Sequence, residues 1–155
     1  MRERTHLPTR PRRPNAQPQA AARPLIRHRT VRPSFDLVIN GGELVGLRSA
    51  VAAGAGELGA GQRVDDVVLV AHELASNVVR HGGGRGQLRL WREDHRIVCR
   101  VSDSGPGLAD ADALGAEPPS PQVPGGRGLW IARRLADLRI ESSPAGTVVT
   151  ASMSL

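Results

Sequence analysis

Residues 73–82 read ELASNVVRHG and lie near the end of a stretch with helical periodicity. Over residues 62–80 one apolar stripe repeats every three or four residues, formed by Val64, Val67, Val68, Ala71, Leu74, Ala75 and Val78. Glu73 and Asn77 are one turn apart and fall on nearly the opposite side of this helix, next to Val70. The pattern predicts a central helix with a polar face, which is either solvated or part of a site.

Glu73 and Asn77 have residue types that suit magnesium and phosphate chemistry. An amide oxygen is a hard ligand of the kind that Mg²⁺ accepts, together with waters and phosphate oxygens. A carboxylate one turn away could order a metal-bound water or take a proton from an attacking hydroxyl. Many ordinary helices carry such a pair, so this helix alone leaves both interpretations open.

A glycine turn follows a strand pattern at residues 103–107, which read DSGPG. A carboxylate at a strand end, such as that of Asp103, can accept a hydrogen bond from an exocyclic amine. Gly105 and Gly107 would let the backbone pass close to a flat ring or a phosphate. The same residue types are common in plain turns, and the local pattern does not decide between the two.

A second glycine turn, GGRG at residues 125–128, leads into an apolar helix. Gly125, Gly126 and Gly128 would expose backbone N–H groups at the positive end of that helix, where phosphates bind. The spacing matches neither the Walker pattern nor the Rossmann fingerprint, which must directly follow a strand. The alternative is a glycine-rich helix start without a ligand.

The remaining segments alternate between strand and helix patterns. Strand patterns cover residues 35–39, 87–91, 96–101, 138–142 and 147–153, and helical patterns begin at residue 43 and cover residues 128–138. Residues 104–127 contain five prolines and little regular pattern, which is typical of a lid. The elements predict a two-layer α/β (α+β) sandwich, in which helices cover one face of a mixed, mainly antiparallel sheet. Cys99 is expected to be a small core residue.

Charge divides the chain into a basic tail and one domain. Residues 1–35 hold nine arginines and one acid, and we expect this proline-rich tail to be disordered. Residues 36–155 hold twelve arginines and fourteen acids, so the domain itself is mildly acidic. No stretch approaches the roughly 20 apolar residues of a membrane span. We therefore expect a cytoplasmic protein without membrane contact, in which nucleic acid would bind only through the tail.

The motifs occur in a recognisable order: E-x-x-x-N on a helix, D-x-G-x-G after a strand, a lid, G-x-G-L opening a helix, and Gly146-Thr147 in the last hairpin. This order resembles the Bergerat-type ATP-binding fold shared by gyrase, heat-shock chaperones, histidine kinases and mismatch-repair ATPases. More narrowly, residues 36–155 resemble the bacterial anti-sigma factor serine kinases, whose usual first motif is close to residues 73–82.

The resemblance implies a role for each polar motif residue. Glu73 would be the base that activates the acceptor hydroxyl of a partner serine or threonine, and Asn77 would bind Mg²⁺. Asp103 would bind the adenine amine of ATP, with Thr147 nearby through its hydroxyl or a water.

The resemblance also implies that the other motif residues line the nucleotide. The adenine side would be lined by Gly105 and Gly107. The phosphates would lie beneath a lid of residues 108–124 and would be surrounded by Gly125, Gly126, Gly128 and Leu129. Arg127 would reach the γ-phosphate or the partner, or it would remain a solvated lid residue.

These roles imply an ATP-binding regulator of the anti-sigma type, and the presence of Glu73 favours a protein serine/threonine kinase. Its partner would be an anti-anti-sigma protein of the STAS type, a sigma factor, or both, and the sequence leaves open a homodimer. The alternative is a non-catalytic module in which ATP shapes a surface that sequesters a regulator. The length argues against gyrase-like and mismatch-repair enzymes, which need a following transducer domain, and against sensor kinases, which need an upstream phospho-acceptor hairpin.

Overall fold

The computed structural model describes residues 34–41, 44–111, 113–120 and 126–155. Its strands are β1 (Phe35–Asn40), β2 (Arg85–Glu93), β3 (Arg96–Asp103), β4 (Asp137–Ser143) and β5 (Gly146–Ser154). Its helices are α1 (Leu44–Glu57), α2 (Val64–His81) and α3 (Arg127–Leu135), with a short 3-10 turn, η1 (Gly61–Arg63), before α2. Residues 1–33 lie outside the described residues, so the disorder expected for the basic tail stays a prediction.

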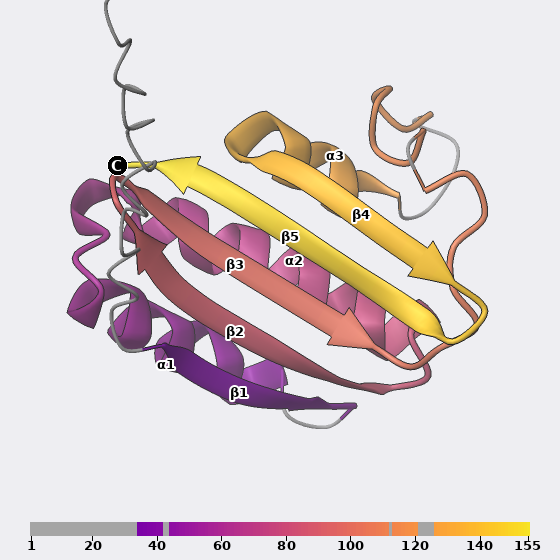
Figure 1. The fold of residues 1–155 in the computed structure, drawn as a ribbon, viewed down its shortest axis with the longest axis horizontal. Helices are drawn as coiled ribbons and strands as arrows, with labels where there is room; N and C mark the ends of the chain where they lie inside the picture. Colours follow the sequence, from indigo (N-terminus) through magenta and orange to yellow (C-terminus); the bar gives the residue numbers. More distant parts are fainter. Residues whose placement is uncertain (1–33, 42–43, 112, 121–125) are drawn as a thin grey trace, which may run out of the picture.

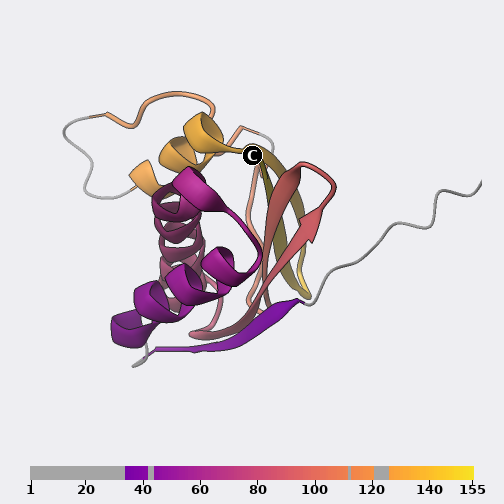
Figure 2. The same cartoon turned by 90° about the vertical axis from the view of Figure 1, so that its left-hand side faces the viewer.

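The five described strands form one sheet in the order β1-β2-β3-β5-β4 (Figure 1). Figure 2 shows the helices on one side of this sheet, so the predicted two-layer sandwich is confirmed. Each of the four neighbouring strand pairs is antiparallel, where the sequence pattern led us to expect a mixed sheet that was mainly antiparallel. Two helices lie between β1 and β2, and they return the chain to the end of the sheet where β1 stopped.

The central helix α2 packs across the sheet and contributes much of the core. Leu74 and Val78 are buried in one cluster with strand residues Leu88 and Val101. Val70 is also fully buried, although it lies on the side of the helix that carries Glu73 and Asn77, because α3 packs against α2. The interpretation of that side as a solvated helix face is therefore wrong.

The helix α3 ends earlier than the sequence pattern predicts. We expected it to continue to Leu138, but it ends at Leu135, and Ala136 is already extended, with φ −145° and ψ 155°. Leu138 instead pairs with Ala151 in the β4–β5 ladder. The hydrogen bonds of that ladder come from residues farther along the chain, so the local apolar spacing could not show where the helix stops.

Cys99 lies in the middle of the sheet, on β3, and its side chain is fully buried. Burial raises the pKa of the thiol from 9.0 to about 12, because the thiolate would lose its hydration. The expectation of a small, unreactive core residue is confirmed.

Candidate functional site

A pocket of about 640 Å³ lies between α2, α3 and the ends of β3 and β5. Eight of the eleven predicted site residues line it: Glu73, Asn77, Asp103, Gly126, Arg127, Gly128, Leu129 and Thr147. Gly105 and Gly107 are not among the lining residues, and Gly125 lies outside the described residues. Segments that are far apart in the sequence thus meet around one cavity, whose volume is in the usual range for a small-molecule ligand.

Asp103 ends β3, and backbone groups hold its carboxylate in place. Oδ1 accepts hydrogen bonds from the N–H groups of Gly105 at 2.9 Å and of Thr147 at 3.3 Å. Oδ2 makes no hydrogen bond within the described residues, so it is available to a donor in the pocket. We call this part of the pocket, together with the adjacent Gly82, the Asp103 end.

Two glycines allow the close packing of the Asp103 end. A Cβ on Gly82 would lie 2.6 Å from Cγ of Asp103, and a Cβ on Gly105 would lie 2.7 Å from Cα of Gly82. Both distances are too short for non-bonded carbon atoms. The atom that a Cβ on Gly105 would meet belongs to the backbone, which cannot rotate aside as a side chain can. Gly107, with φ 81°, packs in the same way against the carbonyl group of Ser143. In this structure, the first glycine motif therefore supports the wall behind Asp103.

Glu73, Asn77 and the N-terminus of α3 form the other part of the pocket, which we call the Glu73 end. α3 follows Gly126, whose φ of 76° is left-handed, and no side chain of the described residues caps the helix. The first N–H groups of a helix have no intrahelical partner, so this terminus can bind an anion. A Cβ on Gly128 would lie 2.6 Å from Oε2 of Glu73, which shows that the carboxylate lies directly beside this terminus.

The donor set of the Glu73 end fits a magnesium ion and phosphates. Asn77 is half-buried, lines the pocket and makes no side-chain hydrogen bond within the described residues. An amide oxygen in that position suits Mg²⁺, which takes most of its other ligands from water and phosphate. The uncapped N-terminus of α3 supplies the N–H donors that phosphate oxygens require.

Part of the predicted lid forms a further wall of the pocket, through Leu108, Leu114 and Gly115. The N–H of Leu108 donates to Oγ of Ser142 at 2.7 Å, and Nε of Arg133 donates to the carbonyl of Leu114 at 2.8 Å. These bonds tie the described part of the lid to β4 and to α3. Predicted lid positions outside the described residues are residue 112 and residues 121–124.

Three lining residues at the end of α2 were absent from the predicted site: Arg80, His81 and Gly82. Arg80 and His81 follow Asn77 by three and four positions, so they share its side of the helix. That spacing is visible in the sequence, but cations in the last turn of a helix also suit its negative end, so the spacing alone does not indicate a site. The structure shows that Arg80 brings positive charge to the pocket.

Residues 43–153 match the model of the histidine kinase-like ATPase domain. The chain belongs to this family. The match spans α1 and α2, both glycine motifs and the final hairpin, and so contains every predicted site residue. Membership of the histidine kinase-like ATPase family implies that the domain binds ATP.

Three relatives illustrate how far the similarity extends. AfsQ2, a signal transduction histidine-protein kinase of Streptomyces coelicolor, is 42% identical over 45 residues, which are 29% of this chain and 8% of that protein. The crystal structure of the RsbU and RsbW domains of Rv1364c from Mycobacterium tuberculosis gives a TM-score of 0.59 at 19% identity, over 80% of this chain and 33% of that one. The histidine kinase domain of the blue-light activated histidine kinase EL346 from Erythrobacter litoralis gives 0.51 at 20% identity, over 74% and 60%. At these identities the two structures confirm the fold alone, and this chain spans a third or less of the first two relatives' lengths.

Proposed function

We propose that this chain is an ATP-dependent protein serine/threonine kinase of the anti-sigma type, which phosphorylates a hydroxyl group of an anti-anti-sigma partner. The observation that carries the proposal is the place of Glu73, beside the N-terminus of α3 and in the same pocket as Asn77 and Asp103. A carboxylate there lies next to the groups that would hold the terminal phosphate. A module that only binds ATP does not need a base at that position.

The Asp103 end would recognise the adenine base. Oδ2 of Asp103 would accept a hydrogen bond from the exocyclic amine, while the bonds from Gly105 and Thr147 to Oδ1 keep the carboxylate oriented. Guanine carries a carbonyl oxygen where adenine carries its amine, and two acceptors cannot share a hydrogen bond. The fixed carboxylate would therefore select ATP over GTP.

The Glu73 end would position the phosphates. Asn77 would hold Mg²⁺ through its amide oxygen, and the bound metal would neutralise charge on the phosphate oxygens. Arg127 is the first residue of α3 and is exposed at the pocket, so its guanidinium can reach either the γ-phosphate or a docked partner. Arg80 adds a second positive charge on the α2 side of the pocket.

In the reaction, the hydroxyl oxygen of the partner forms a bond to the γ-phosphorus, and the bond from that phosphorus to the β–γ bridging oxygen breaks. ADP leaves, and Glu73 accepts the proton of the hydroxyl group. Most of the acceleration in such a transfer comes from positioning and charge neutralisation, so the partner must dock with its hydroxyl close to Glu73.

The choice of an anti-sigma role is supported by the motif of residues 73–82 and by the RsbW domain of the solved neighbour. The partner would be an anti-anti-sigma protein of the STAS type, a sigma factor, or both. No helix within the described residues has the length and apolar character that a membrane crossing requires. We place the protein in the cytoplasm, where ATP and a transcription regulator would be available to it.

The replacement Glu73→Gln tests the assigned base. The amide keeps the size of the side chain but cannot accept the proton, so we expect transfer of ³²P from γ-labelled ATP to fall about 10²–10⁴-fold. The affinity for ATP should stay within about threefold of the wild type. The measurements are transfer to purified anti-anti-sigma candidates and calorimetric titration with ATP.

The matched control is Glu57→Gln, which changes an exposed glutamate at the end of α1, away from the pocket. Transfer by Glu73→Gln at the wild-type rate would show that Glu73 is not the base. A wild-type chain that binds ATP tightly but phosphorylates none of the partners would favour the non-catalytic module instead.

A further inference from the structure

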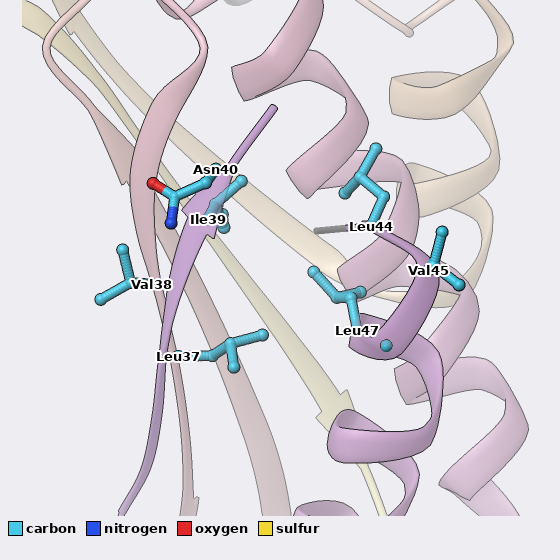
Figure 3. A pocket seen from close by; sticks show the side chains of 8 residues that line it. Leu37, Val38, Ile39, Asn40, Leu44, Val45 and Leu47 are labelled. Atoms are coloured by element: carbon cyan, nitrogen blue, oxygen red, sulfur yellow. The ribbon is translucent and has the colours of Figure 1, made fainter. Parts of the chain in front are cut away.

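The hollows of this molecule differ in what they offer a ligand. One of about 460 Å³ lies between β1 and α1, and Figure 3 shows Leu37 and Leu47 pointing toward one another across it. Asn40 is the one polar side chain among the residues that line it, so little in this hollow could orient a ligand. The nucleotide pocket, by contrast, contains a chain of hydrogen-bonded hydroxyl groups at its Asp103 end.

This chain contains Ser142 on β4 and Thr147 on β5. The two residues lie opposite one another in the antiparallel ladder, and their side-chain oxygens are 3.2 Å apart. Thr147 lines the pocket but is only 4% exposed, so its hydroxyl group needs a hydrogen-bond partner in the protein. Within the described residues, that partner is Oγ of Ser142.

A backbone group of the lid gives this hydrogen bond a direction. The N–H of Leu108 donates to Oγ of Ser142 at 2.7 Å, and a hydroxyl group that accepts one hydrogen bond becomes a better donor of the next. If Ser142 donates to Thr147, the hydrogen of Ser142 has an acceptor and the hydrogen of Thr147 is left for the pocket. In the opposite direction, the hydrogen of Ser142 would have no acceptor within the described residues.

Gly107 brings the lid backbone close enough for this bond. Its φ of 81° is left-handed, and a Cβ at this position would lie 3.0 Å from Oγ of Ser142. Another side chain there would therefore crowd the hydroxyl group to which the next residue, Leu108, donates. The glycine of the first motif thus serves the hydroxyl chain as well as the wall behind Asp103.

The N–H and the hydroxyl group of Thr147 have separate tasks. The N–H donates to Oδ1 of Asp103 at 3.3 Å, which leaves Oδ2 as an acceptor for the pocket. The oriented hydroxyl group adds a donor to the same pocket. This combination matches the edge of adenine, where the exocyclic amine donates and N1 accepts. Guanine presents the reverse, a carbonyl oxygen and an N–H.

We propose that Ser142 is a positioning residue that makes Thr147 a hydrogen-bond donor to N1 of adenine, directly or through one water molecule. The inference rests on the proposed ATP site and adds a residue that does not line the pocket, so Ser142 acts through Thr147. Because the first donor of the chain is the N–H of Leu108, the same bonds join recognition of the base to the described part of the lid.

The test compares ATP with 1-deaza-ATP, in which a C–H group replaces N1, by calorimetric titration in the presence of Mg²⁺. For the wild type, we expect 1-deaza-ATP to bind about tenfold more weakly, because one hydrogen bond is lost. Ser142→Ala removes the group that orients Thr147, so its affinity for ATP should fall about fivefold. Its affinity for 1-deaza-ATP should stay within about twofold of the wild type, because that nucleotide cannot accept the hydrogen bond.

Two further variants complete the comparison. Ser142→Thr keeps a hydroxyl group at this position and should retain the preference for ATP over 1-deaza-ATP. The matched control is Ser152→Ala, which removes the hydroxyl group of a half-buried serine of β5 that does not line the pocket. This control should bind both nucleotides as the wild type does.

Equal losses of affinity for both nucleotides in Ser142→Ala would show that the serine only stabilises the hairpin, as cross-strand pairs do, and would overturn the proposal. Unchanged affinity for ATP in that variant would also overturn it. The titrations need no protein partner, so a failure of the kinase assignment would appear in the transfer assay and not in this comparison. A wild type that binds neither nucleotide would contradict the ATP site and the role of Ser142 together.

Discussion

The two ends of the nucleotide pocket are built in different ways. At the Asp103 end, the carboxylate accepts two backbone hydrogen bonds and packs against a glycine backbone that leaves no space for a side chain. At the Glu73 end, neither Glu73 nor Asn77 makes a side-chain hydrogen bond within the described residues, and the helix beside them is uncapped. One end is shaped before any ligand binds, and the other offers polar groups whose partners a ligand would supply.

The difference follows from what each end would contact. A purine base is rigid and uncharged, so a fixed wall and one oriented acceptor are enough to recognise it. During a transfer the phosphoryl group moves and its charge is redistributed, so the groups at this end need partners that only the bound nucleotide, metal ion and acceptor supply. Changes at the Asp103 end should therefore affect stability and the binding of the base, and changes at the Glu73 end should affect the reaction or the metal-dependent part of binding.

Apart from the replacement of Glu73 itself, the largest expected effect is that of Gly128→Ala at the Glu73 end. The added methyl group meets the flexible end of Glu73, so the side chain can turn aside at a cost below about 1 kcal/mol in the free energy of unfolding. A base displaced by about 1 Å should transfer phosphate about 100-fold more slowly. Transfer assays and thermal unfolding measure the two effects, and Gly56→Ala is the control. Transfer by Gly128→Ala at the wild-type rate would contradict the role of Glu73 as the base.

Asp103→Ala should weaken binding at the other end. The variant loses a charged acceptor for the base, and a hydrogen bond of that kind contributes about 2 kcal/mol, or about 30-fold in the dissociation constant of ATP. Calorimetric titration measures this, and Asp65→Ala, an exposed acid in the first turn of α2, is the control. Unchanged affinity in Asp103→Ala would mean that the base binds elsewhere.

Gly105→Ala should lower stability, in contrast to Gly128→Ala. Its methyl group would press on the backbone of Gly82, which cannot move aside, and overpacking of this kind costs about 1–3 kcal/mol. Urea unfolding of both variants gives the comparison directly. Equal losses of stability at Gly105 and Gly128 would contradict the distinction between a fixed and an adaptable end.

Asn77→Ala should have the smallest effect, confined to metal-dependent binding. Without the amide oxygen, the affinity for ATP in the presence of Mg²⁺ should fall about tenfold, since one ligand of the ion is lost. With a chelator present, the variant and the wild type should bind ATP equally. A loss that persists without the metal would assign Asn77 to the nucleotide itself.

Much of this molecule could be predicted from local patterns. The stripe of α2, the turn after β3 and the glycines before α3 depend on residues close together in the chain, where helical and turn geometry apply directly. The end of α3 at Leu135 could not be predicted in this way, because the pairing of β4 with β5 competes with the helix. The closeness of Gly82 to Gly105 was equally hidden, since it joins the end of a helix to the end of a strand.

The sequence alone determined the class of fold, because the periodicity of its apolar residues indicates which segments form helices and strands. The spacing of its motifs also indicated which residue types could form a magnesium–nucleotide site. Only the packing of α3 on α2 decided that the side of the helix carrying Glu73 is half-buried beside a helix terminus. The packing also assigned Gly105 and Gly107 to the supporting wall and brought Arg80 to the pocket. Contacts between distant segments depend on the shapes of both surfaces, and neither segment carries that information by itself.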